Sequence, residues 1–321
     1  MVEASKYSND VLLKGVIELL VKDDPILERL KFKDIKGNGL TYDVETTMST
    51  AAFYSVNEAW NESTSVVTQH TAFTHILGGD ADVDNFLKAT RGNLQDLMQE
   101  QIAAKTKAIR WVFNETALYG YTITETKRFD GIHYLLRSST YNTVPVGNDG
   151  VPQALKLIKL EEAVDMIKDG KADVILMTKA MRREINQYLN GVGGMTKEMI
   201  SGKTVQTLFD IPIVVSDFLS DKESCDRDYG SGSSGDYGHQ YTDGTALGND
   251  QSSTSIFIVQ FADNALSGVQ SDGGMRIDRF PKLENKDGSR TRIVWYPGIM
   301  IQSIITCAKV TGISPTATVG A

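Results

Sequence analysis

Cysteine and histidine, the residues that most often build metal centres, are scarce in this chain. The 321 residues include two cysteines and four histidines. Cys225 and Cys307 are too few for a disulfide framework or a structural zinc site. His70 and His75 are the only close histidine pair, and their odd separation on an expected strand places them on opposite faces. This pattern argues against a shared metal ion.

An excess of basic charge and a long apolar run are also lacking. Lys and Arg number 33 and Asp and Glu number 41, so the net charge is −8. An acidic chain is a poor candidate for a protein that coats nucleic acid through phosphate contacts. No apolar run approaches the ~20 residues that span a bilayer, and residues 1–10 lack the apolar core of a secretory signal. With 41% apolar and 23% charged residues, we expect a soluble globular protein of a reducing compartment, with no membrane partner.

Catalytic signatures are missing as well. The chain has no G-x-S-x-G nucleophile elbow and no P-loop. Gly230, Gly232 and Gly235 fit the pattern G-x-G-x-x-G. A dinucleotide-binding fingerprint also requires a strand before these glycines and a helix after them, and the sequence shows neither pattern. We therefore expect a flexible loop at these glycines and do not expect an enzyme.

An acidic run precedes the longest expected helix. Asp80, Asp82 and Asp84 form D-x-D-x-D, but a calcium loop needs Gly where Asn85 stands and Glu where Arg91 stands. We interpret the three carboxylates as caps and first-turn acids of that helix.

The first part of the chain predicts a projecting arm beside a long helix. Expected elements are helices at 11–22 and 26–33, strands at 40–45 and 66–76, and a long helix at 82–119. The two strands form a ribbon with an apolar-studded tip, and an isolated ribbon of two strands is marginally stable in water. The arm should therefore lie on a partner. A helix over 82–119 would be roughly 55 Å long, which predicts an elongated molecule.

The second part predicts a mixed α/β domain. Expected elements are helices at 153–169 and 179–189, strands at 173–178, 211–216, 255–261 and 298–306, and a hairpin at 275–296 turning at Asp287-Gly288. Residues 220–254, between two strands, are rich in Gly, Ser and Asp. We expect a solvent-exposed loop there, mobile at 230–238, which can be shortened without unfolding the chain.

The order of these parts resembles the major capsid protein of tailed bacteriophages, in the branch without an N-terminal scaffolding domain. The resemblance extends to about residue 313, and the joint order of its segments is more specific than any one of them. The segments that carry it are Ser8–Leu20, Gly37–Tyr42, Tyr54–Trp60, Leu77–Asp84, Ala117–Gly120 and Phe129–Ile132.

This resemblance implies an α+β capsid fold with four parts. They are an N-terminal arm at 1–34, an extended β-hairpin loop at 35–79, a peripheral domain with a spine helix and the late hairpin at 80–135 and 271–297, and a mixed α/β axial domain at 136–270 and 298–321, with 220–254 as a surface insertion. The extended loop would lie over a neighbouring subunit.

The resemblance also implies a function. The chain would assemble as hexamers and pentamers into an icosahedral shell around double-stranded DNA, through a procapsid, without a catalytic residue or a cofactor. Its partners would be further copies of itself, a scaffolding protein, a portal and, in some shells, a decoration protein. Packaged DNA would be bound only weakly and non-specifically. The protein would reside in the virion after assembly in the bacterial cytoplasm.

Two other classes stay open on sequence alone: another virion component, and a soluble hydrolase whose site is scattered in the sequence. Sizing the purified protein separates them, because a monomer with a deep polar pocket favours the hydrolase and shells or capsomers favour the capsid.

Contacts between subunits are expected at the tip of the extended loop. Buried aromatic residues dominate interface energies, and the tip residues are Phe53, Tyr54, Val56 and Trp60. Glu58 and Glu62 in the arm should meet basic residues of the neighbour. The candidate partners are Lys88, Arg91, Lys105, Lys107 and Arg110.

The way the shell is locked can also be predicted. In some relatives, an isopeptide bond between a lysine of the extended loop and an asparagine of a neighbouring subunit crosslinks the shell. Residues 37–87 contain no lysine here. The arm cannot supply the amine, and we expect a shell held by non-covalent contacts.

Overall fold

A computed structural model describes most of the chain. The described residues are 25–47, 49–62, 64, 66–86, 94–122, 125–136, 142–147, 151–168, 170–192, 196–200, 203–223, 253–271, 273–284 and 286–320. The helix expected at 11–22, the loop centre at 230–238 and Cys225 lie outside these ranges.

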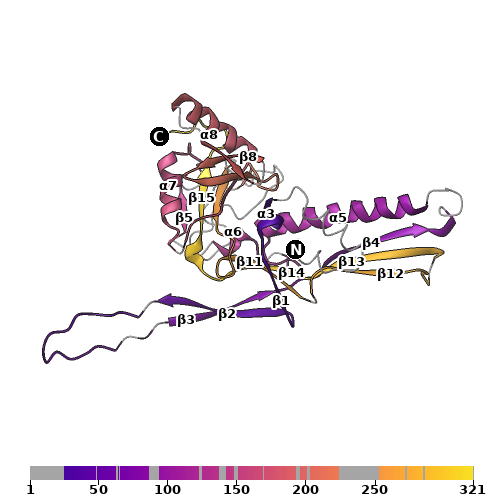
Figure 1. The fold of residues 1–321 in the computed structure, drawn as a ribbon, viewed down its shortest axis with the longest axis horizontal. Coiled ribbons are helices and arrows are strands. Elements are labelled where there is room, and N and C mark those ends of the chain that lie inside the picture. The colour runs from indigo at the N-terminus through magenta and orange to yellow at the C-terminus, as the bar shows by residue number, and fades with distance from the viewer. Residues whose placement is uncertain are drawn as a thin grey trace.

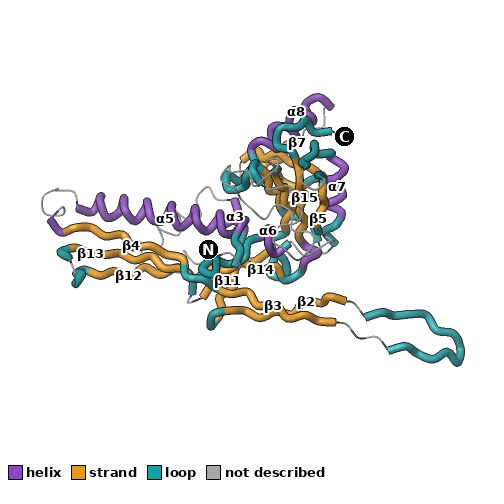
Figure 2. The backbone as a smooth tube through the Cα atoms, turned by 180° about the vertical axis from the view of Figure 1, so that it is seen from behind, coloured by secondary structure: helices purple, strands orange, loops and turns teal. Residues whose placement is uncertain are grey.

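Three parts leave a common junction and give the molecule an elongated shape (Figure 1). An α/β body rises from the junction. A helix–sheet extension, made of α5, β4, β12 and β13, points to one side, and a two-stranded arm points to the other. Figure 2 shows the same arrangement from behind. The α+β class and the elongated shape expected from the sequence are confirmed.

The α/β body is built on a seven-stranded mixed sheet of order β5-β15-β10-β6-β9-β8-β7. The central strands β6 and β10 are buried along their whole length, as expected for strands covered on both faces. Helices α7 and α8 pack their apolar residues against one face of this sheet. The elements are β5 Thr143–Pro145, α7 Leu157–Asp165, β6 Val174–Met177, α8 Lys179–Val192, β7 Thr196–Ile200, β8 Lys203–Leu208, β9 Ile211–Val215, β10 Thr254–Val259 and β15 Cys307–Ile313.

The extension consists of one long helix on a three-stranded antiparallel sheet. Helix α5 has 26 residues, and its buried residues Ile102, Ile109 and Phe113 follow helical spacing. They face the sheet of order β12-β13-β4, where the ring of Phe113 lies 4.8 Å from that of Trp295. The elements are β4 Leu77–Asp84, α5 Leu94–Tyr119, β12 Arg276–Phe280 and β13 Gly288–Trp295. The late hairpin is confirmed, but its turn is not at Asp287-Gly288, because β12 ends at Phe280 and Gly288 already begins β13.

A third sheet, of order β1-β11-β14, forms the junction and supports the arm. Strand β1 runs parallel to β11, where Gly268 leaves room for the ring of Phe32: a Cβ at this glycine would lie 2.5 Å from Phe32 Cδ1. The elements here are α3 Pro25–Arg29, β1 Phe32–Ile35, β2 Gly39–Thr47, β3 Val66–Phe73, α6 Ile132–Leu135, β11 Leu266–Ser271, β14 Pro297–Ile301 and the 3₁₀ turn η1 Ile304–Thr306. None of the described helices is long and apolar enough to cross a membrane.

The long helix does not include the start of the expected range 82–119. Residues 82–84 belong to β4 and pair with β13, and α5 is described from Leu94. Ala81 and Val83 are buried while Asp82 and Asp84 are exposed, so this segment follows the two-residue period of a strand.

Three other expected boundaries were also wrong. The late strand expected at 298–306 is β14 followed by η1, and a separate strand, β15, comes after it. The helix expected at 153–169 is limited to α7, because residues 153 and 156 form β-bridges to the C-terminal segment. The short helix expected at 26–33 is α3 followed by β1.

Candidate assembly surfaces

The arm is anchored at its root and leaves the rest of the molecule towards its tip. One face of the ribbon, with Leu40, Tyr42 and Ala72, packs on Val269 and Met300 of the junction sheet. At the root, the hydroxyl of Ser271 donates to the carbonyl of Gly37 at 2.8 Å, and the amide of Thr74 donates to that of Asn38 at 2.9 Å. The root therefore has a fixed position on the junction sheet.

The tip of the arm is an ordered turn rather than an extended strand pair. The rings of Tyr54 and Trp60 stack with centroids 4.6 Å apart and planes inclined by 17°. The amide of Ser55 donates to the carboxylate of Glu58 at 2.7 Å, and the amide of Glu58 donates back to the carbonyl of Ser55 at 3.1 Å. Asn57 has a φ of 67°, a left-handed conformation that asparagine tolerates well. Glu58 is thus partly committed to shaping its own turn.

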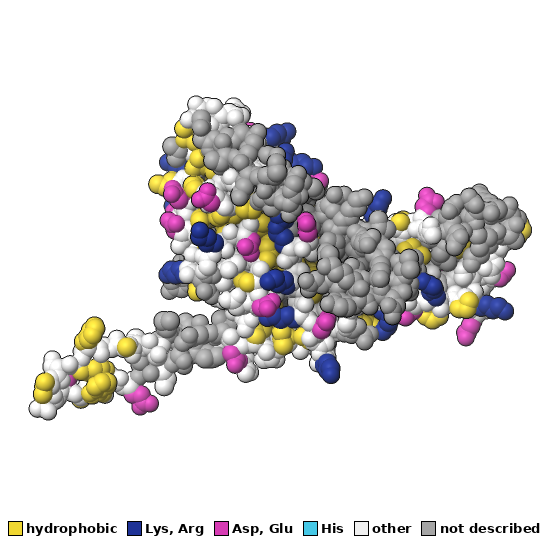
Figure 3. All heavy atoms as spheres, in the orientation of Figure 1, with side chains coloured by type: hydrophobic (Ala, Val, Ile, Leu, Met, Phe, Trp, Pro, Cys, Tyr) yellow, Lys and Arg dark blue, Asp and Glu magenta, His cyan; other side chains and the backbone are white. Residues whose placement is uncertain are grey.

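Apolar side chains at this tip have no core to enter. Phe53 is 106% exposed, Val56 94% and Trp60 81%, whereas Tyr54 is half-buried under the Trp60 ring. Figure 3 shows the apolar side chains gathered at the end of the arm. Exposed apolar surface of this kind marks an interaction site. Of the predicted tip residues, Phe53, Val56 and Trp60 are thus exposed and Tyr54 is half-buried.

The interpretation of the acidic run as caps and first-turn acids of the long helix was wrong for Asp80 and Asp82. Asp80 and Asp82 lie in β4 and pair across the sheet with arginines of β13. Arg292 Nε donates to Asp80 Oδ1 at 2.7 Å, and Arg290 donates to both oxygens of Asp82 at 2.7 and 2.8 Å. Asp84 instead accepts a hydrogen bond from the amide of Phe86, two residues further on, at 2.7 Å.

These pairs change the charge balance of the extension. The hydrogen bond from Arg292 lowers the pKa of Asp80, and hydrogen bonds from Arg290 and then Lys286 lower the pKa of Asp82. Both carboxylates are therefore ionised and neutralised within their own chain, and they contribute little attraction for a neighbour.

The candidate basic partners take different positions on α5. A Cβ at Gly79 would lie 3.3 Å from Lys105 Cδ, so the Lys105 stem covers β4. Lys107 is exposed and Arg110 is half-buried. Lys88 and Arg91 lie outside the described residues. Of the described candidates, Lys107 is therefore the one that is fully exposed to solvent.

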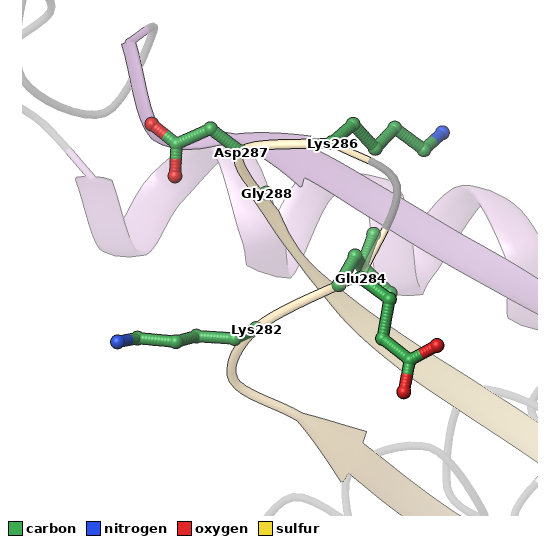
Figure 4. Close-up of a pocket in the computed structure, with 6 residues that line it drawn as sticks. Lys282, Glu284, Lys286, Asp287 and Gly288 are labelled. Atoms are coloured by element: carbon green, nitrogen blue, oxygen red, sulfur yellow. The ribbon is translucent and has the colours of Figure 1, made fainter.

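A hollow at the β12–β13 turn does not form a binding site. It is lined by Lys282, Leu283, Glu284, Lys286, Asp287 and Gly288. In Figure 4 the charged side chains point in different directions and do not converge on one point. Lys286 is also engaged with Asp82 at 3.0 Å.

Among the described residues, no group of three or more His, Cys, Asp or Glu is arranged to hold a metal ion. Cys307 is buried, and burial raises the pKa of its thiol to about 11.

A buried polar cluster at the junction was missed by the sequence reasoning. Glu223 is 1% exposed and accepts hydrogen bonds from the hydroxyls of Tyr119 and Ser255, each at 2.5 Å. His133 Nε2 lies 3.3 Å from the same carboxylate. The Tyr119 hydroxyl also accepts from the amide of Ser220 at 2.9 Å. The cluster joins the end of α5, helix α6, strand β10 and the segment that follows β9.

Comparison with known proteins gives the family. Residues 9–256 match the model described as "Phage capsid family". No curated protein matches the chain.

Solved structures share the fold at low identity. An encapsulin complex from Synechococcus elongatus PCC 7942 is similar with a TM-score of 0.65 and 12% identity, covering 92% of this chain and 90% of that one. The capsid of a native GTA particle has a TM-score of 0.60 and 10% identity, with 89% of each chain covered. A structure of Microbacterium phage Oxtober96 has a TM-score of 0.58 and 11% identity, covering 90% of each chain. These likenesses show the fold.

Proposed function

The chain belongs to the phage capsid family, and on that premise we propose how its parts build a shell. It is a major capsid protein, a structural subunit whose place is the virion. The arm of each copy lies over a neighbouring copy, and the apolar tip supplies most of the energy of that contact. The observation that carries this proposal is the full exposure of Phe53, Val56 and Trp60 on an ordered turn.

The four-part domain plan fits the grouping of the sheets. The arm corresponds to the extended loop at 35–79. The helix–sheet extension corresponds to the peripheral domain, and the α/β body corresponds to the axial domain around which copies gather as hexamers and pentamers. The junction sheet combines β1, at the boundary between the N-terminal arm and the extended loop, with β11 and β14, which lie almost wholly within the axial ranges. This pairing supports a subunit that enters the shell as one unit.

The partners follow from the same role. Copies of the chain are the main partner. A scaffolding protein takes part in assembly in the host cytoplasm, and a portal and, in some shells, a decoration protein complete the particle. The net charge of −8 supports weak, non-specific contact with packaged DNA. Neither a catalytic group nor a cofactor takes part in this function.

The Trp60→Ala variant tests the proposal. It removes an indole that is stacked on Tyr54 and otherwise exposed, so the free subunit should keep its stability while assembly fails. Trp60→Phe keeps an aromatic ring at the tip and is the matched control, expected to assemble nearly normally. Shell yield can be measured by sedimentation and stability by urea unfolding. Normal shells from Trp60→Ala would show that the tip is not an interface.

A further inference from the structure

The turn between β8 and β9 holds a bulky aromatic residue in an unfavourable backbone conformation. Phe209 and Asp210 connect the two strands, with φ of 53° and 61°. Leu208 pairs with Ile211 across the turn, so this is a two-residue hairpin in which both central residues are left-handed. Asparagine and glycine are the usual residues there, because a larger side chain is crowded at positive φ. The other described residues with positive φ are Asn57 and five glycines.

The turn cannot relax, because the residues on either side of it belong to the core. Leu208 and Ile211 are each 6% exposed and pack in the apolar core of the α/β body. A shift of register by one residue would move these side chains to the other face of the sheet. The fold therefore imposes the left-handed conformation on Phe209, and a residue that tolerates this conformation would adopt it at a lower cost.

The side chains of the turn gain little from their own chain. The Phe209 side chain is 38% exposed. Within the described ranges it belongs to none of the three apolar clusters and makes no ring contact. Asp210 is exposed, and its carboxylate has no ion pair or hydrogen bond with a described residue. Unfavourable conformations of this kind persist mainly where they serve a function, so the exposed ring indicates a contact outside the single chain.

A second copy offers apolar surface on the opposite flank of the α/β body. Helix α7 packs beside β5 and β15, whereas β8 and β9 lie towards the other edge of the seven-stranded sheet. Figure 1 shows α7 and β8 on different sides of the body. Val151 and Ile158, before and in α7, are both exposed. Two different surfaces on opposite flanks can form a head-to-tail contact that repeats from copy to copy until a ring closes.

The charges on the α7 flank allow this contact without dominating it. Lys156, between Val151 and Ile158 in the sequence, is exposed and has no ion pair among the described residues. Glu162 is paired with Lys159 at 2.7 Å, and Glu161 is exposed beside them. The flank is therefore close to neutral, and apolar packing must supply most of the energy of a contact there.

We propose that Phe209 of one subunit packs on Val151 and Ile158 of a second copy, with Asp210 beside Lys156. This inference rests on the proposed function, in which copies gather around the α/β body, and it names the residues of that contact. The ion pair sets the orientation of the two copies, because charge pairs of this kind contribute more to specificity than to affinity. The arm takes no part in the contact.

The Phe209→Asn variant separates assembly from stability, because the inference gives the two effects opposite signs. Asparagine tolerates the left-handed conformation, so the urea midpoint of the free subunit should rise. Loss of the ring should raise the protein concentration needed for half-maximal shell formation by about tenfold. Phe209→Tyr keeps the ring and the crowded backbone, and this matched control should behave as the unaltered chain does in both assays. Unchanged assembly of Phe209→Asn, or a lower urea midpoint, would overturn the inference.

A double-mutant cycle tests the receiving surface. Ile158→Ala should weaken assembly, and the double variant Phe209→Asn/Ile158→Ala should be little worse than the more severe single variant, because both changes remove one contact. Val192→Ala trims an exposed apolar residue at the end of α8 and should assemble normally. Fully additive effects of the two changes would overturn the pairing.

Cysteine cross-linking keeps this inference distinct from the proposed function. In a Cys225→Ser background, Asp210→Cys/Lys156→Cys should give covalent oligomers on oxidation, and neither single variant should. The same cysteine pair should link in capsomers of the Trp60→Ala protein, because the contact does not involve the arm. Shells that form normally but show no such link would overturn this inference alone, whereas a chain that sediments only as a monomer would contradict the proposed function as well.

Discussion

Removing the carboxylate of Glu223 should destabilise the subunit more than any surface charge change. Glu223 is buried between the hydroxyls of Tyr119 and Ser255 and the ring of His133. The side chains of Glu223 and His133 are fully buried, and Tyr119 is partly buried. Replacing it by alanine leaves several buried polar groups without a partner, each of which costs about 1–3 kcal/mol.

The milder variant Glu223→Gln sharpens this prediction. Glutamine fits the same space, but its NH₂ group faces a hydroxyl that already donates, so at least one hydrogen bond is lost and the charge is removed. We expect a loss of about 2–4 kcal/mol in the free energy of unfolding, within the range for buried charged hydrogen bonds. Glu162→Gln makes the same chemical change at an exposed pair with Lys159 and should cost no more than about 1 kcal/mol.

The assay is urea unfolding of the unassembled subunit, followed by the fluorescence of its tryptophans. Trp295 is fully buried at the core of the junction and reports on loss of the fold. The dependence of the free energy of unfolding on urea concentration, the m-value, should be the same for all variants, so that a lower midpoint means lower stability. If Glu223→Gln and Glu162→Gln lower the free energy of unfolding by amounts that differ by less than about 1 kcal/mol, the cluster does not stabilise the junction, and the argument from burial is refuted.

Three further predictions concern pH, salt and covalent chemistry. Burial beside Glu223 raises the pKa of the Tyr119 hydroxyl above its usual 10. Because the unfolded chain then loses the hydroxyl proton at a lower pH than the folded chain does, the free energy of unfolding should fall as the pH rises above 10. Tyr119→Phe should reduce this fall, measured as the urea midpoint against pH. Asp82→Asn removes exposed ion pairs with Arg290, so its small cost should shrink further in about 1 M salt; a cost unchanged by salt would contradict this. Shells should run as single chains on a denaturing gel, since residues 37–87 have no lysine; a covalent ladder would refute it.

The sequence predicted the elements whose contacts are local or strongly periodic. The ribbon of β2 and β3 was predicted from the strand patterns at 40–45 and 66–76, and the structure pairs the two strands antiparallel. The buried run of β6 and the amphipathic helix α8 after it are also found where they were expected. For β6 and α8, the residues that decide the structure are close neighbours in the sequence.

The sequence of the acidic run contained the two-residue period of a strand, but the expected long helix was given more weight. Ala81 and Val83 alternate with Asp80, Asp82 and Asp84, which is the two-residue period of a strand. The expected long helix made capping the natural role for these acids. Their actual partners are Arg290 and Arg292, more than 200 positions away, and no local pattern points to them.

The junction cluster carried no sequence signal at all. Glu223 stands in a polar stretch that predicts a loop, and its partners Tyr119, His133 and Ser255 are 104, 90 and 32 positions away. Buried carboxylates are rare, so the composition of the segment favours solvent exposure. Only the three-dimensional arrangement brings these groups to one point.

The distribution of buried and exposed apolar groups explains why a single copy is incomplete. The core from Phe32 through Phe113 to Trp295 fixes the extension to the junction sheet, and the Glu223 cluster fixes α5 to the α/β body. A subunit held at these points can present its arm in a constant direction. The tip turn, by contrast, is shaped only by its own stack and turn hydrogen bonds, and its apolar residues find no core within the chain. On the proposed function, another copy covers this tip, and that contact adds to the free energy of assembly without adding to the stability of the single chain.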